Sequence, residues 1–181
     1  MSNARKLANL LGTSTTVPSS KLSLVSSDLP AGCILQVQNV EMTQRHHIST
    51  TNRTGLSGQY AVSITPTSSS NKILVQTNIN TIGYDTLTTR AILVRNPSGG
   101  SAVDVAQMGW YNSGATWKPF MTNFCHLDSP ATTSSVVYYV EWRIEQMSGS
   151  NGLYVNYANN NAGFGSGNDS RATITVSEIA V

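Results

Sequence analysis

Hydrophobic and polar residues alternate along most of this chain with the two-residue period of a half-buried β-strand. The segment 60–76 shows the pattern clearly, since Val62 and Ile64 alternate with polar neighbours. Pro66 ends that run because proline has no amide hydrogen to donate to a neighbouring strand. The Ser and Asn residues of 68–71 suit a turn, and a second apolar run follows them. This segment predicts strand, turn, strand.

The same alternation recurs, with turn signals between the runs, and predicts about ten short strands. In 136–146 every second residue from Val136 to Ile144 is apolar, and in 172–180 we expect Ile174, Val176 and Ile179 to face inward. The predicted strands are 33–40, 43–51, 60–65, 72–83, 87–95, 102–111, 118–127, 136–146, 153–157 and 172–180.

No long amphipathic helix is predicted after residue 30, which argues against an α/β fold. This number of short strands favours an all-β, antiparallel jelly-roll sandwich over residues 30–181. Residues 1–29 differ: the Leu residues of 7–11 have helical spacing, and a polar run with Pro18 follows. We therefore expect 1–29 to be an extended arm outside the sandwich.

The composition is poor in charge. Charged residues make up 11% of the 181 residues and the net charge is +2, against roughly 25% charged residues in an average soluble protein. Hydroxyl and amide side chains replace them, which is typical of extracellular and virus-particle proteins. No basic cluster is present that would follow a nucleic-acid backbone, and no apolar run is long enough to cross a membrane or to serve as a secretory signal.

The sequence offers few candidates for catalysis or metal binding, and each has a plainer interpretation. His46 and His47 are adjacent on a predicted strand, so they point to opposite faces and cannot chelate one ion. The same argument separates Cys125 from His126, and it disfavours a thiol nucleophile with Asp128 as the third member. We expect Cys125 to be a small core residue.

The two cysteines, Cys33 and Cys125, are far apart in the sequence and lack metal-ligand spacing. One disulfide is an alternative, but we expect two buried free thiols. Glu141 and Glu145 lie about 13 Å apart on one strand, too far for a glycosidase pair. We expect them to pair with arginines such as Arg90, Arg95 and Arg143. The glycine-rich segment 163–167 precedes a strand, which argues against a phosphate-binding loop.

Aromatic residues supply the remaining candidates. Trp110, Tyr111, Trp117 and Phe120 surround a turn signal, and such residues either pack a hairpin or make contacts with sugars or partner proteins. We favour packing. A second set is expected in the core or at an oligomer axis: Tyr138, Trp142, Tyr154 and Tyr157.

Three segments together resemble small structural proteins of tailed bacteriophages. They are 29–37 (LPAGCILQV), 63–75 (SITPTSSSNKILV) and 170–180 (SRATITVSEIA), and they bracket nearly the whole predicted domain. Cys33 departs from the pattern, which has a small polar residue there. The resemblance implies a virion protein with a jelly-roll domain of the tumour-necrosis-factor and C1q type that assembles as a homotrimer. It brings no catalytic motif.

From the residues and this resemblance we expect a non-enzymatic structural protein of the virion, without metal or cofactor. The favoured placement is a decoration, or cement, protein on the capsid surface that clamps neighbouring major capsid subunits. The alternatives are a tail-fibre or spike knob that binds a host glycan through the aromatic residues around 110–120 and the loop 159–170, and a free lectin-like module. The anchoring residues of the arm would be Arg5, Lys6, Leu7, Leu10 and Leu11, and the surface-contact residues Trp110, Tyr111, Trp117 and Phe164.

Overall fold

The computed structural model describes residues 29–55, 60–114, 116–157 and 171–181, and all of its regular structure is β-strand. The arm residues Arg5 to Leu11, the segment 163–167 and Phe164 lie outside these ranges. The strands are β1 (Ile34–Met42), β2 (His46–Ile48), β3 (Thr54–Gly55), β4 (Val62–Ile64), β5 (Lys72–Gly83), β6 (Thr86–Pro97), β7 (Val103–Asn112), β8 (Lys118–Thr122), β9 (Cys125–Asp128), β10 (Val136–Ser148), β11 (Leu153–Val155) and β12 (Ala172–Ile179).

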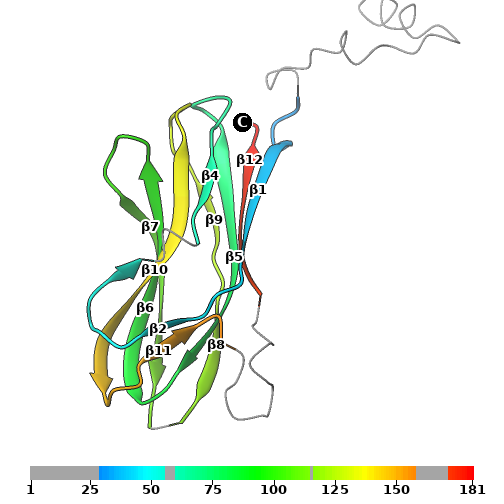
Figure 1. Cartoon of the computed structure of the whole chain (residues 1–181). Helices are drawn as coiled ribbons and strands as arrows, with labels where there is room; N and C mark the ends of the chain where they lie inside the picture. The colour runs from blue at the N-terminus through cyan, green and yellow to red at the C-terminus, as the bar shows by residue number, and fades with distance from the viewer. Residues whose placement is uncertain (1–28, 56–59, 115, 158–170) are drawn as a thin grey trace, which may run out of the picture.

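These strands form two antiparallel sheets that pack face to face (Figure 1). The seven-stranded sheet has the order β1-β12-β5-β11-β2, with β8 and β9 on the other edge of β5. The five-stranded sheet has the order β3-β10-β6-β7, with β4 also paired to β10. The main pairs are nested in sequence: β1 with β12, β4 with β10, β5 with β9 and β6 with β7. Nesting of this kind is the jelly roll, so the predicted fold is confirmed.

The core lies between the sheets and follows the predicted alternation. In β10, Val136, Tyr138, Val140, Trp142 and Ile144 are all fully buried. Opposite them, Ile73, Val75 and Ile79 of β5 are buried from the other sheet. Strands with one buried and one solvated face produce this two-residue period, which is why their ranges were readable from sequence.

Most predicted ranges match, and 72–83 coincides with β5. The single strand predicted over 118–127 is wrong, because the chain breaks between β8 and β9. There the Thr77 hydroxyl donates to the Thr122 carbonyl (3.0 Å) and accepts from the Phe124 amide (2.8 Å). This side chain replaces regular pairing and lets Phe124 turn into the core, where it is 6% exposed. The short β3 was not predicted.

The inward position predicted for Ile179 is also wrong. The register pairs Ile179 with Ile34 and Lys72, on the outer side, and Glu178 takes the inward place with no exposed surface. Four contacts satisfy its carboxylate: Gln36 Nε2 (2.7 Å), the Thr67 amide (2.7 Å), Thr67 Oγ1 (2.9 Å) and Asn71 Nδ2 (2.7 Å). Burial raises the pKa of Glu178, but these hydrogen bonds outweigh it and the net pKa lies below the usual carboxyl value.

A second buried carboxylate joins the two sheets. Asp128 of β9 accepts from Arg95 of β6 (2.9 and 3.0 Å) and from the Tyr138 hydroxyl of β10 (2.7 Å). Burial first, and then the bond to Asp128, raises the pKa of Tyr138. Because β9 belongs to one sheet while β6 and β10 belong to the other, this contact fixes the sandwich at that end.

Candidate binding surfaces

The described part of the chain contains no group of three or more His, Cys, Asp or Glu residues placed to hold a metal ion. In the same residues, no helix has the length and hydrophobicity to span a membrane. Two other features attract attention: an apolar patch near the first described residues, and an aromatic cluster toward the other end of β5.

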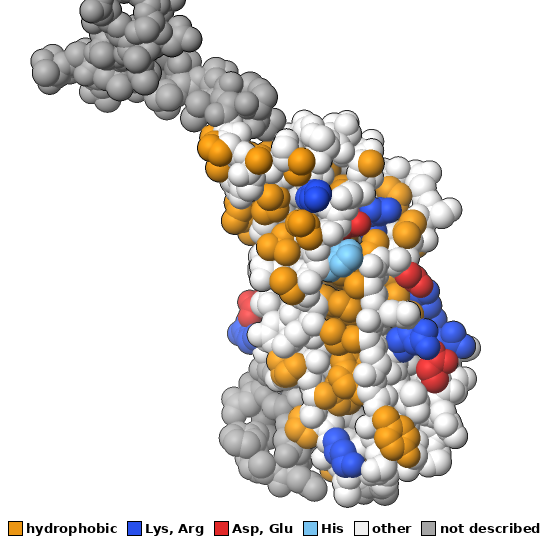
Figure 2. All heavy atoms as spheres, turned by 180° about the vertical axis from the view of Figure 1, so that it is seen from behind, with side chains coloured by type: hydrophobic (Ala, Val, Ile, Leu, Met, Phe, Trp, Pro, Cys, Tyr) orange, Lys and Arg blue, Asp and Glu red, His pale blue; other side chains and the backbone are white. Residues whose placement is uncertain are grey.

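The apolar patch lies on the outer face of the seven-stranded sheet and consists of Ile34, Val37, Leu74, Leu127 and Ile179. Strand register places these residues in two rows. Val37, Ser177, Leu74 and Leu127 follow one another across β1, β12, β5 and β9, and Ile34 and Ile179 pair in the next row. Ile34 is 59% exposed, Val37 52% and Leu127 49%. Figure 2 shows apolar side chains gathered at the end of this face where the chain enters the described part.

Few charged groups interrupt the patch. Lys72 pairs in register with Ile179 at its margin. The Arg171–Glu41 ion pair (2.9 Å) lies farther along, beyond Val37 and Asn39 on β1. The first described residues are fixed beside the patch, because the Gly32 amide donates to the Ala180 carbonyl (2.8 Å) and the Ala180 amide donates to the Cys33 carbonyl (2.9 Å).

Cys125 lies on this same outer face, in register with Gln76, and is exposed, while Cys33 is half-buried. Both cysteines are free thiols, as predicted, but the prediction that they are buried is wrong. The reason is the break before β9, which moves Phe124 inward and leaves Cys125 on the outer side. His126 lies in register with the buried Val75, so Cys125 and His126 do point to opposite sides.

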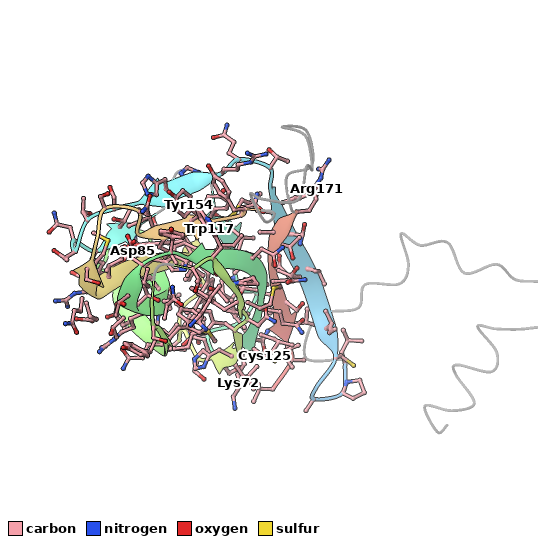
Figure 3. The ribbon with its side chains drawn as sticks, turned by 90° about the horizontal axis from the view of Figure 1, so that it is seen from below. Lys72, Asp85, Trp117, Cys125, Tyr154 and Arg171 are labelled. Atoms are coloured by element: carbon pink, nitrogen blue, oxygen red, sulfur yellow. The ribbon has the colours of Figure 1, made fainter. Side chains whose placement is uncertain are left out.

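The aromatic cluster consists of His47, Tyr84, Trp117, Tyr154 and Tyr157. The rings of His47 and Tyr154 stack at 4.4 Å, and Trp117 contacts Tyr154 at 5.0 Å and Tyr84 at 4.7 Å between ring centroids. Tyr157 meets Tyr154 edge-on at 4.9 Å. Trp117 and Tyr154 lie together in Figure 3, with Asp85 on the same side of the molecule.

This cluster differs from the one that the sequence suggested. Trp110 does meet Phe120, at 4.5 Å, but Tyr111 points the other way on β7 and is 68% exposed. Trp117 belongs instead to the new cluster. Tyr138 and Trp142 are in the core as predicted, whereas Tyr154 and Tyr157 are half-buried and lie outside it. Tyr154 is in register with His47 of β2 and with Ile82 of β5. The neighbours of Ile82 along β5 face inward, so the Tyr154 ring lies on the outer side of the sheet.

The predicted carboxylate partners are right in part. Glu145 pairs with Arg90 (3.4 Å) and Arg143 (3.6 Å). Glu141 pairs with Arg53, which the sequence did not suggest, and Arg95 pairs with Asp128 instead. Arg53 approaches Glu141 because β3 adds to the edge of β10.

Comparison with known proteins gives a likeness in fold alone. No protein-family model matches the sequence, and no curated protein matches it. Among solved structures, similar chains occur in the Gx strain of infectious bursal disease virus (12% identity, TM-score 0.45, covering 83% of this chain and 39% of that one). A T13 particle of the same virus has 10% identity and a TM-score of 0.46, and the match covers 80% of this chain and 37% of that one. The D431N mutant of its VP2 protein has 13% identity and a TM-score of 0.43, and the match covers 79% of this chain and 36% of that one.

The chain thus spans less than two fifths of those viral chains. Similarity at this level does not assign a function, so the function must be inferred from the chain's own residues.

Proposed function

We propose that this chain is a non-enzymatic structural protein of a tailed-phage virion, in which three copies form a decoration unit on the capsid surface. Residues 1–29 fasten the unit, and it clamps neighbouring major capsid subunits. The jelly-roll fold, the charge-poor composition and the resemblance of three segments to phage structural proteins support this proposal.

The observation that carries the proposal is the apolar patch. Its two rows leave the aliphatic side chains of Ile34, Val37 and Leu127 exposed to water. Contiguous exposed patches of this kind mark protein interaction sites, because covering them releases the free energy of apolar burial. A second and a third copy of the chain are the proposed occupants.

The position of the patch also suits the proposed arm. The chain enters the described part beside β12, at the patch end of the sheet. Association through the patch would therefore bring three copies of residues 1–29 close together. Arms carrying Arg5, Lys6, Leu7, Leu10 and Leu11 would then act on one shell together, and several weak contacts would add through multivalency.

Each Asp and Glu carboxylate in the described ranges has a hydrogen-bond or ion-pair partner, which favours a structural role over catalysis. Asp128 is bonded by Arg95 and Tyr138, and Glu178 by three neutral side chains and an amide. Glu141 and Glu145 are paired with arginines. A general acid or base has to exchange its proton with a substrate, and carboxylates committed in this way are poorly placed to do so.

Light scattering on the purified full chain tests self-association, with Leu127→Asp as the disrupting variant. Leu127 is 49% exposed on β9, so the variant should fold, and we expect it to remain a monomer while the parent is a trimer. Val103→Asp is the matched control, because Val103 is 41% exposed on β7 in the other sheet. A parent that stays monomeric, or equal disruption by both variants, would refute the assembly.

Copy number on purified virions tests the placement. Hundreds of copies per particle are expected for capsid decoration, and a handful would indicate a tail-fibre or spike knob instead. The aromatic cluster at the end away from the arm is the observation that favours that second candidate. Absence from virions would leave a free lectin-like module. Replacing Leu7, Leu10 and Leu11 by Ser should abolish attachment to the particle while the trimer remains.

A further inference from the structure

We propose that the aromatic cluster of His47, Tyr84, Trp117, Tyr154 and Tyr157 is a binding site for a neutral saccharide. This inference does not rest on the proposed assembly, because the cluster is built within one chain. Its rings come from four separate parts of the sequence: β2, the β5–β6 turn, the loop before β8, and β11 with its following residues.

The segments that carry the rings are fixed by hydrogen bonds to one another. The Tyr84 amide donates to the Gly152 carbonyl (3.0 Å), and the Asn151 amide donates to Asp85 Oδ2 (2.8 Å). Buried Asn112 donates to the Asp85 carbonyl (2.7 Å), and to the Thr116 carbonyl (3.4 Å) next to Trp117. A site held in place before binding loses less conformational entropy when its ligand arrives.

The backbone of the neighbouring turn is shaped around Asp85. Gly149 has φ +120°, and a Cβ there would lie 2.5 Å from the Asp85 carboxylate. Asp85 itself has φ +73° and is 6% exposed. The acidic group is therefore held inside the turn. A charged group that does lie against the rings is the guanidinium of Arg45, 5.0 Å from the centroid of the Tyr157 ring.

The exposed surface combines aromatic faces with neutral hydrogen-bonding groups. Aromatic faces carry partial negative charge and attract the C–H groups of a sugar ring. The Asn151 carbonyl contacts the His47 ring nitrogen, and Thr116 directly precedes Trp117. The ammonium of Lys118, which follows Trp117, is already bonded to the Ser113 carbonyl (2.9 Å). This mixture matches a saccharide, which presents apolar C–H faces and hydroxyls together.

The size of the surface argues for a small ligand instead of a protein. Of the five rings only His47 is exposed and the other four are half-buried, while a stable protein interface covers about 800 Å² on each partner. The apolar patch, which continues across four strands, is the better protein-binding surface.

The test uses the full-length chain on an array of neutral oligosaccharides of glucose, galactose, mannose and N-acetylglucosamine, with sialylated and uronic-acid saccharides beside them. Calorimetric titration then measures affinity for each neutral saccharide retained. We expect binding to at least one neutral saccharide, about tenfold weaker in Trp117→Ala. Tyr111→Ala is the matched control, because Tyr111 is 68% exposed and outside the cluster, and its affinity should be unchanged.

His47→Ala is the second variant if Trp117→Ala does not fold, since His47 is exposed and stacks on Tyr154. Retention of no neutral saccharide would overturn the proposal, as would equal losses in Trp117→Ala and Tyr111→Ala. Binding of acidic saccharides alone, abolished by Lys118→Ala, would also overturn it. Trimer formation is measured separately, so a failure here leaves the assembly proposal intact and the reverse also holds.

Discussion

The two ends of β5 differ in how they hold the sandwich together and in what they present to solvent. At the Lys72 end, two buried carboxylates, Glu178 and Asp128, lie inside the sandwich in register with Ile73, and aliphatic side chains lie on the outside. At the Gly83 end, turns fixed by backbone hydrogen bonds support half-buried aromatic rings. Leu74 and Ile82 mark these surfaces and lie about 26 Å apart along the strand.

The difference teaches how one fold can present two kinds of surface. Aliphatic side chains in rows gain most when a large, flat surface covers them, as a second subunit would. Aromatic rings on a rigid turn make directional contacts over a small area. At the Lys72 end, buried polar contacts join the strands inside the sandwich, so the outer face of the sheet there remains available for binding. Each of the following experiments perturbs one of these two ends.

The largest effect is expected from Glu178→Ala, which removes the buried acceptor of four hydrogen bonds, from Gln36, from the amide and hydroxyl of Thr67, and from the buried Asn71. We expect the free energy of unfolding to fall by about 3 kcal/mol in denaturant titrations. Glu178→Gln keeps one acceptor oxygen and should lose less. Saccharide affinity at the other end should not change, and a loss of stability below about 1 kcal/mol would contradict the importance of these contacts.

At the aromatic end, Gly149→Ala should cost about 2 kcal/mol of stability, because its Cβ would meet the Asp85 carboxylate and its φ is positive. Gly99→Ala is the matched control: Gly99 also has a positive φ, +75°, but nothing lies within 4 Å of its Cβ. The control should lose about 1 kcal/mol. Equal losses in thermal unfolding would show that the Asp85 contact adds nothing.

Acid should weaken the Lys72 end. The folded pKa of Glu178 lies below its unfolded value, so its contribution is complete above the usual carboxyl range and is lost as pH falls through the folded pKa. Denaturant titrations at a series of acidic pH values should therefore show that the free energy of unfolding falls less steeply with decreasing pH in Glu178→Gln than in the parent. An unchanged slope in that variant would assign the acid sensitivity to other carboxylates.

The smallest effect on stability, and the most direct view of the apolar patch, comes from labelling Cys125 in a Cys33→Ser background. Cys125 is exposed on the same outer face as Leu127. Its alkylation should slow as protein concentration rises and the patch becomes covered, while the Leu127→Asp variant should react at a constant rate. Concentration-independent labelling in the parent would place the self-association surface elsewhere.

The sequence alone determined the fold class, most strand ranges and the inward face of β10, because alternation is a local property that each strand displays by itself. It also predicted free cysteines, and the separation of Cys125 from His126 that makes a thiol nucleophile improbable. Strict alternation from Ile174 would have placed Glu178 inward, but a buried carboxylate is costly without partners, and its partners lie more than a hundred residues away.

Only the tertiary structure decided which side chains from different strands lie next to one another. Trp117 contacts Tyr154 because β11 and β8 both pair with the same stretch of β5, one on each edge. The apolar patch arises because the register of four strands aligns Val37, Leu74 and Leu127, residues that appear singly in the sequence. Periodicity gives each strand its two faces, whereas the position of one strand against the next depends on turns, bulges and long-range hydrogen bonds that no local pattern records.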